Sequence, residues 1–519
     1  MRVTVLHLVN ARLAGRPDRP VDVLLADGHV AAVVPTGAPL PGDLDVGYTG
    51  PERVDLDGRT VIPGLWDAHT HLTQWAMVRR RLDVSTATGP AHAAALVGAA
   101  LTDERRHPAP GRPFVGFGFR WATWDDEPTS EVLDYVAGEV PVILISGDLH
   151  SAWASTAGLR YLGIEHHPTG LLREEEWMPA SPEIVTVSAA DADELLADAA
   201  RAAAERGVVG VVDFEVDDNL TAWRRRAMAG WDLLRVRAAV WEQHLDAVVD
   251  AGLHTGDVLA PGSGPAADLI TQGPLKVISD GSLNTLTAFC FDDYAGFAGP
   301  DAHGILNVAT DQLVPLMTHA HASGLRCAIH AIGDHANALA LDAFEASRAR
   351  GSVEHAQMLQ AEDVARFAAL GITASVQPEH AMDDRDASDE LWVGRTERAF
   401  RLADLHAAGV PLVLGSDAPV APLDPWFAIA SAVTRSRDGR DPWHPEQRID
   451  VATALAASTD GRGVRVRPGD PADLAVLELD PLTLSDDGTP TGAAVLAEVL
   501  RELPVAGTLV AGRWTYRGF

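Results

Sequence analysis

The sequence contains little cysteine and no long apolar run. Among 519 residues there are two cysteines, Cys290 and Cys327, which is too few for a disulfide framework and indicates a reducing compartment. The N-terminal residues lack the apolar core and cleavage site of a secretory signal, and no run approaches the roughly 20 apolar residues that span a bilayer. We therefore expect a cytoplasmic protein that does not cross a membrane.

Phosphate-binding motifs and excess positive charge are also missing. The sequence has neither a glycine-rich phosphate loop nor a dinucleotide fingerprint, which argues against a nucleotide-dependent enzyme. The formal net charge is −32, and an acidic protein is repelled by nucleic acids and by anionic membrane surfaces. These absences leave a small molecule as the expected partner. A homodimer is the default assembly for such an enzyme.

Lysine is the scarcest charged residue. All of the 41 basic residues are arginine except Lys276. A GC-rich genome explains the bias but not the exception, because a surface lysine could drift to arginine, whereas a site that needs a primary amine could not. Lys276 is therefore a candidate functional residue.

The length and the order of apolar runs predict two domains. A chain of this length, 47% hydrophobic, suits a barrel with a smaller companion domain. Short apolar runs near both ends, broken by Gly, Asp and Pro, are typical of small antiparallel strands. We expect residues 1–60 and 462–519 to form one small β-sandwich from both termini.

Residues 61–461 alternate strand-like runs with Ala-rich amphipathic segments, as βα repeats do. This pattern predicts an α/β fold, a TIM-like (β/α)₈ barrel. Two further strand-like runs, 114–119 and 142–146, lie between the first and second barrel strands, so we assign residues 80–200 to an insertion, or cap, after the first strand. The candidate barrel strands are 61–66, 208–214, 234–240, 275–279, 325–330, 352–355, 372–377 and 410–415.

Candidate metal ligands lie at the ends of these strands, where barrel enzymes place their active sites. His69 and His71 end the first strand two residues apart, so in an extended segment both point the same way. His330, His355 and Asp417 end the fifth, sixth and eighth strands. Each alone is more simply a hydrogen-bonded barrel histidine or a turn aspartate. Together they indicate a metal site, because imidazole and carboxylate are good zinc ligands.

Lys276 lies near the end of the fourth strand. An ammonium group beside bound metal would be repelled, whereas a lysine that has reacted with carbon dioxide carries a carbamate, an anion whose two oxygens can bridge two metals. The alternative is a buried lysine paired with Asp280 or Asp417, because buried lysines are normally paired.

The ligand set and its surroundings resemble a known family. The phrases PGLWDAHTHL, LKVISDGSLNTLTA, AIHAIGDHA, VEHAQML, ASVQPEH and LGSDAPV are similar to those of amidohydrolase family 3, in the amidohydrolase superfamily, which includes the YtcJ-like proteins and the N-substituted formamide deformylases. His150-Ser151-Ala152-Trp153 also resembles this group, although Asp148-Leu149 replaces its commoner Asp-Gly. The resemblance extends over residues 61–430.

The resemblance implies a role for each ligand. His69 and His71 would bind the more buried metal, and His330 and His355 the more exposed one. Lys276, as the carbamate, would bridge them, and Asp417 would contact the buried metal and the reactive water. One or two divalent ions are expected, most simply zinc.

These roles imply a mechanism, which is a hypothesis at this point. Metal lowers the pKa of bound water towards roughly 7, so that hydroxide attacks an amide-like carbonyl. Asp417 would take the proton and deliver it to the leaving nitrogen. The candidates for substrate contact are His150, Trp153, Asp334, Gln377 and His380, of which Trp153 is equally well read as a core residue and His380 as a loop cap.

Other functions remain open. Deamination of a small heterocycle is the second hydrolytic reading, although superfamily deaminases usually keep one metal and lack the bridging lysine. A cyclic amide or lactone is a further substrate class. A non-catalytic regulator on this fold is disfavoured because every expected ligand is present.

Overall fold

The computed structural model describes residues 5–519 apart from 40–51, 104–107, 109–110, 122–123, 148–150, 178, 181–183, 185–187 and 265. The chain divides into two compact units. The first contains residues 1–72 and 200–519, and the second contains residues 73–199.

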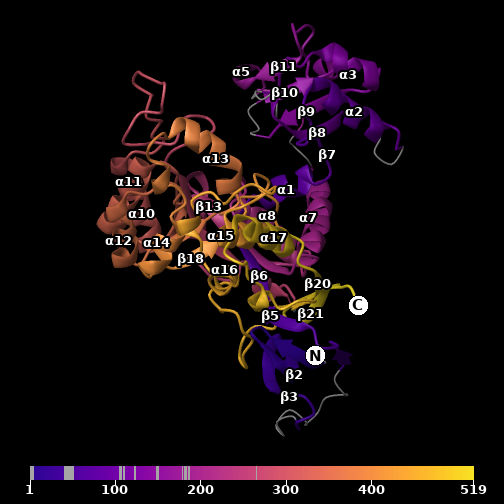
Figure 1. Cartoon of the computed structure of the whole chain (residues 1–519), viewed down its shortest axis with the longest axis vertical. Coiled ribbons are helices and arrows are strands. Elements are labelled where there is room, and N and C mark those ends of the chain that lie inside the picture. Colours follow the sequence, from indigo (N-terminus) through magenta and orange to yellow (C-terminus); the bar gives the residue numbers. More distant parts are fainter. Residues whose placement is uncertain are drawn as a thin grey trace. The chain divides into compact units, whose positions relative to one another are not determined.

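A parallel sheet of eight strands forms the centre of the first unit (Figure 1), and each strand pairs in parallel with the next. The eight predicted runs all contribute, which confirms the mixed α/β barrel. The strands are β6 (Leu65–Thr70), β12 (Val208–Asp213), β13 (Arg235–Trp241), β14 (Ile270–Ile278), β15 (Cys327–Ala331), β16 (Gly351–His355), β17 (Thr373–Val376) and β18 (Leu412–Leu414).

The sheet is nearly closed between its first and last strands. Asp417 N donates to the His69 carbonyl at 2.7 Å, and His71 N donates to the Ala418 carbonyl at 2.8 Å. Thr70 and Ala418 form a parallel bridge. Closure therefore brings the segment after β18 against the end of β6, which are far apart in the sequence.

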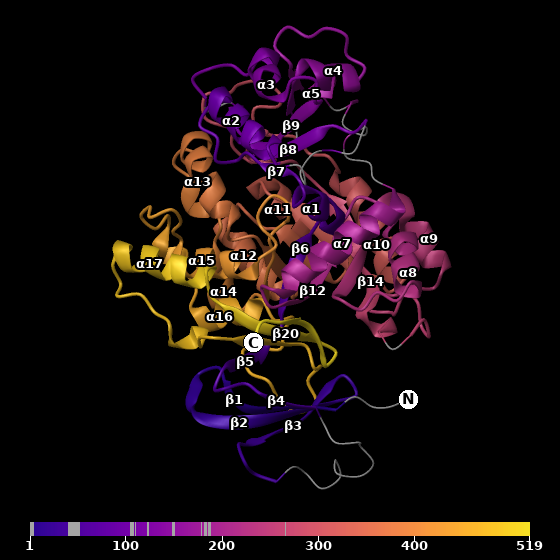
Figure 2. The ribbon, with the colours of Figure 1, turned by 90° about the vertical axis from the view of Figure 1, so that its right-hand side faces the viewer.

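Helices cover the outside of this sheet (Figures 1 and 2). Outward-facing strand residues such as Val353, Ala374 and Val376 pack in one large apolar cluster with helix residues such as Phe344 and Phe367. The helices are α8 (Asn219–Met228), α9 (Leu245–Asp250), α10 (Thr310–Ala322), α11 (Asp334–Ser347), α12 (Ala361–Leu370), α14 (Leu402–Ala407), α15 (Pro425–Thr434), α16 (Val451–Ala457) and α17 (Pro490–Arg501). A further helix, α13 (His380–Leu391), follows β17 at the C-terminal end of the barrel.

The first barrel strand begins later than predicted. Residues 60–63 form β5 (Thr60–Pro63), which pairs with strands of the terminal sheet, and the barrel strand starts only at Leu65. Gly64 lies between them, where a Cβ atom would come within 2.2 Å of the Val209 side chain. The apolar run 61–66 therefore supplies two strands, and periodicity alone does not reveal the break.

Strands from both ends of the chain pair with each other, with the N-terminal strands in indigo and β20 and β21 in yellow (Figure 2). All eight are connected into one hydrogen-bonded sheet, and its folding into a two-layer sandwich stays a prediction. They are β1 (Leu6–Leu13), β2 (Arg16–Ala26), β3 (His29–Pro35), β4 (Glu52–Asp55), β5, β19 (Leu474–Leu477), β20 (Val505–Val510) and β21 (Arg513–Arg517).

The second unit has its own five-stranded sheet and core. It covers 73–199, where the insertion was expected at 80–200, and its C-terminal boundary falls inside helix α7 (Ala189–Ala204). Its elements are α1 (Leu72–Val78), β7 (Leu82–Asp83), α2 (Pro90–Leu101), β8 (Phe114–Phe119), α3 (Ser130–Ala137), β9 (Val142–Ser146), β10 (Ser151–Ala154), α4 (Thr156–Tyr161), β11 (Leu171–Arg173) and α5 (Glu174–Trp177).

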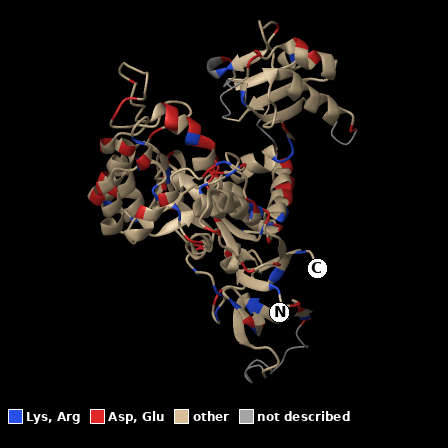
Figure 3. Cartoon of the chain, viewed as in Figure 1, with Lys and Arg blue, Asp and Glu red and all other residues tan. Residues whose placement is uncertain are grey.

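Two properties of the whole chain bear on its partners. Acidic residues are spread over helices and loops of both units (Figure 3). In the part of the chain that the structure describes, no helix combines the length and apolarity needed to cross a membrane.

Candidate metal centre

The six expected ligands lie at the C-terminal end of the barrel. Because the strands are parallel, their C-terminal ends meet at one mouth. The ligands come from five strands or the residues that directly follow them. They are His69 on β6, His71 just after it, Lys276 on β14, His330 on β15, His355 at the end of β16 and Asp417 after β18.

Asp417 and His69 are the central pair of this group. Asp417 Oδ1 lies 3.4 Å from His69 Nε2 and 3.3 Å from His71 Nε2. Lys276 Nζ lies 3.3 Å from the same His69 nitrogen. Side chains from the first, fourth and eighth barrel strands are therefore in direct contact.

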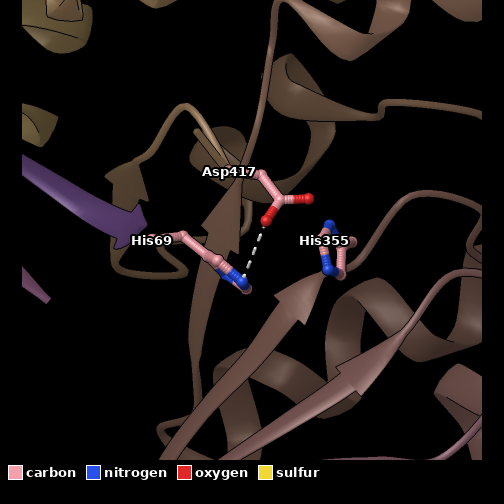
Figure 4. A group of neighbouring side chains, drawn as sticks. All are labelled: His69, His355 and Asp417. Atoms are coloured by element: carbon pink, nitrogen blue, oxygen red, sulfur yellow. Dashed lines mark ion pairs between the residues drawn. The ribbon is translucent and has the colours of Figure 1, made fainter. Parts of the chain in front are cut away.

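His355 completes a compact trio with His69 and Asp417 (Figure 4). One ligand atom from each residue lies within 4.8 Å of the others. The His330 ring packs edge-on against His355 with a centroid separation of 4.4 Å. The group thus offers several nitrogen and oxygen donors within the span of one or two ions.

Two of these ligands adopt an unusual backbone conformation. His355 has φ of 72° and Asp417 has φ of 56°, a left-handed conformation that non-glycine residues rarely adopt. In a regular strand Glu354 and His355 would point to opposite faces. The left-handed turn at His355 breaks this alternation and lets both neighbours serve the same site, where such strain typically gathers.

The electrostatics of the site favour metal-binding forms of its histidines. Burial lowers the pKa of His69 to about 4 and that of His330 to about 3. Both rings are therefore neutral near pH 7, and a neutral imidazole has the lone pair that binds a metal.

Several buried histidine nitrogens lack hydrogen-bond partners, which bears on whether this site fits a metal ion. Among the described residues, His71 Nδ1, His355 Nδ1 and His380 Nε2 are buried and accept or donate no hydrogen bond. Buried polar atoms normally have a partner, so three such nitrogens on rings within or beside the expected ligand set indicate a missing ligand. The donor set, imidazoles with a carboxylate, fits a divalent transition metal.

Comparison with known proteins identifies the group to which this site belongs. The model of the Amidohydrolase family, Amidohydro_3, matches residues 52–516. The chain belongs to this family. It is therefore a hydrolase acting on carbon–nitrogen bonds, and the resemblance inferred from the sequence is confirmed.

The chain is also similar to individual proteins. Protein LONG AFTER FAR-RED 3 of Arabidopsis thaliana is 28% identical, over 79% of this chain and 75% of its own. The N-substituted formamide deformylase of Arthrobacter pascens is 26% identical, over 99% of this chain and 98% of its own. A metal-dependent hydrolase of unknown function from Pyrococcus horikoshii OT3 shares the fold, with a TM-score of 0.75, 24% identity and coverage of 93% and 99%.

Glu354 is a residue of this amidohydrolase that the sequence analysis missed. Its Oε2 lies 2.7 Å from His69 Nδ1, and the Ser352 hydroxyl donates to its other oxygen. A carboxylate on one ring nitrogen fixes the tautomer and orientation of a metal-binding histidine. The only signal for Glu354 in the sequence was its position next to His355, because the residue that it contacts, His69, is 285 positions away in the chain.

We expect Glu354→Gln to weaken metal binding by about 10–100-fold, because the ring of His69 is then held less firmly and is less basic. Competition with a chromogenic chelator measures this affinity. The exposed substitution Glu345→Gln serves as a control. Unchanged metal affinity in a folded Glu354→Gln protein would contradict the orienting role.

The predicted substrate-binding residues fall into distinct environments. His380 lies closest to the metal ligands, with Nε2 3.9 Å from Asp417 Oδ2. Gln377 directly follows β17 and is buried, and its Oε1 has no partner within the described residues. Both remain candidates for substrate contact.

Asp334 and Trp153 have partners within the protein. The Asp334 carboxylate accepts from Phe291 N, Gln360 Nε2 and Arg398 Nη1, so its oxygens are already engaged. Trp153 is fully buried in the core of the second unit and donates to the Thr129 carbonyl at 3.0 Å. His150 lies outside the described residues.

Proposed function

We propose that this protein cleaves an amide or N-formyl-type carbon–nitrogen bond, using one or two divalent ions, most simply zinc. The observation that carries the proposal is the position of six side chains with nitrogen or oxygen donors at the barrel mouth. His69, His71, Lys276, His330, His355 and Asp417 would hold the metal. When bound, a divalent ion polarises a carbonyl oxygen and lowers the pKa of water.

Asp417 is the proposed general base and acid. Its two oxygens have different surroundings, because Oδ1 faces His69 and His71 whereas Oδ2 has His380 at 3.9 Å. Oδ2 is therefore the oxygen placed to accept a proton from water and return it to the leaving nitrogen. Asp417 N donates to the His69 carbonyl, and this bond fixes the carboxylate relative to the strand that carries two other ligands.

Lys276 is proposed to carry a carbamate. Its amine is buried, 3.3 Å from His69 Nε2 and 4.4 Å from the Phe214 ring centroid. An ammonium group here opposes metal binding by charge repulsion. Conversion to an anion removes the repulsion and adds two oxygen ligands.

The pH dependence of this reaction is testable on the metal-free protein. Burial lowers the pKa of Lys276 to about 8, and only the neutral amine reacts with carbon dioxide. At a fixed concentration of carbon dioxide, we therefore expect the rate to rise with pH and level off above about pH 8. Carbon-13 NMR measures it with labelled bicarbonate as the source. A rate still rising steeply at pH 9.5 would show an unshifted lysine.

Metal content per chain tests the proposed function. We expect about two zinc equivalents in protein purified without chelator and with bicarbonate, and turnover of N-substituted formamides or simple amides. The deformylase relative suggests this substrate panel. About one equivalent would favour a single-metal site and return deamination to contention, and no uptake of zinc, manganese or iron would overturn the proposal. Cytoplasmic location, a small-molecule substrate and a homodimer stay predictions from the sequence.

A further inference from the structure

A cavity of about 490 Å³ opens at the N-terminal end of the barrel and extends inward behind the metal centre. The interior of such a barrel is normally a packed core of large branched side chains. A space that extends into such an interior is therefore a feature to explain.

Small inward-facing residues account for the cavity. Along β16 and β17 alternate residues point inward, and those on the inner face are Ser352, Thr373 and Ser375, which line the cavity. Ala68 lines it from β6. These short side chains leave space that the large branched residues of a packed barrel core would fill.

The cavity fits water better than an apolar filling. Ser375, Ser352 and Thr373 line it with small polar residues, and Arg326 adds a charged one. A roomy space lined by several polar residues holds water rather than an apolar filling. The lower wall includes the exposed residues Gly256 and Arg326. Because Arg326 directly precedes β15, the cavity reaches solvent at the N-terminal end of the barrel.

The inner end of the cavity reaches the back of the metal centre. Glu354 and Phe214 both line it. Glu354 contacts His69 at 2.7 Å. The Phe214 ring lies 4.5 Å from the His69 ring and 4.4 Å from Lys276 Nζ. One layer of side chains therefore separates the cavity from the lysine amine.

We propose that this cavity is a rear passage through which carbon dioxide reaches Lys276 from the N-terminal end of the barrel. The inference rests on the carbamate in the proposed function. The lone pair of the neutral amine forms the N–C bond, one C=O π bond of carbon dioxide opens onto oxygen, and the displaced N–H proton passes to water in the passage.

The inner lining favours carbon dioxide over bicarbonate. It includes the apolar side chains of Val212, Phe214 and Val413 and the carboxylate of Glu354, whereas Arg326 lines the passage at its solvent end. A small neutral molecule crosses such a lining, whereas an anion is desolvated and repelled by the carboxylate. Formation of the carbamate on Lys276 would then not depend on whether a substrate occupies the C-terminal mouth of the barrel.

Filling the passage tests the inference. Ser375→Leu adds bulk to the cavity, whereas Ser375→Ala keeps it open and is the matched control. Thr373→Leu, two residues away on the same inner face of β17, is a second blocking variant should Ser375→Leu fail to fold. Each protein is stripped of metal and carbamate and then exposed to carbon-13 bicarbonate, and the carbamate signal is followed by NMR. Because the chain has one lysine, one side-chain signal is expected.

We expect the leucine variants to form the carbamate at least about tenfold more slowly, because a filled core excludes small molecules. Their final carbamate level, and the rate of Ser375→Ala, should match the unmodified protein. Equal rates in all folded variants would overturn the rear passage while leaving the carbamate in place. Absence of any carbamate in the unmodified protein, with or without zinc, would overturn both the carbamate and this inference.

Discussion

Asp417→Asn is expected to lower kcat by about 10²–10⁴-fold, the range that a positioned general acid or base contributes. The amide has nearly the shape of the carboxylate and can still face His69 and His71, but it cannot accept a proton at neutral pH. Metal content should therefore stay close to that of the unmodified protein. Steady-state kinetics with an N-substituted formamide, together with metal analysis on the same sample, provides both values.

A matched control separates this effect from the loss of any buried carboxylate. Asp363 is 2% exposed on α12, outside the metal centre, and Asp363→Asn makes the same chemical change there. Its kcat should remain within about twofold, because a substitution away from the site acts only through stability. A metal-replete Asp417→Asn protein with unchanged kcat would contradict the general base role.

Lys276→Arg is expected to remove at least one metal equivalent and to lower kcat/KM by about 10²-fold or more, because guanidinium forms no carbamate and keeps a positive charge beside the metal. Lys276→Ala should lose the same metal but leave a space. Added formate or acetate, whose carboxylate can take the place of the carbamate, should then restore part of the metal content in the Ala variant and none in the Arg variant.

The lysine variants also check the spectroscopic assignment. Both must lack the carbamate signal in carbon-13 NMR. If Lys276→Arg retained two metals and full activity, Lys276 would be a structural residue paired with its neighbours. The site would then be read as one centred on the His69, His355 and Asp417 trio alone.

Local patterns in the sequence predicted the barrel and placed candidate ligands at its mouth, because those patterns depend on neighbouring residues. A run of alternating or apolar residues marks a strand wherever it packs, and the end of a parallel strand is the site edge of a barrel. His69, Lys276, His330, His355 and Asp417 could thus be placed at one mouth without knowing any contact between them. The break between two strands at Gly64 could not be predicted in this way, because it depends on the close approach of Val209 from another strand.

Tertiary structure alone decided how those residues are used. Asp334 looked available in the sequence, but Gln360 and Arg398 occupy its oxygens, and Trp153 is core because of what folds around it. The pairing of Glu354 with His69, and the open interior beside Ser375, arise from side chains on different strands. The sequence by itself determined which chemical groups reach the mouth. The hydrogen-bond partners of these groups, and the space behind the metal centre, depend on contacts between residues far apart in the chain. The local periodicity of the sequence does not encode such contacts.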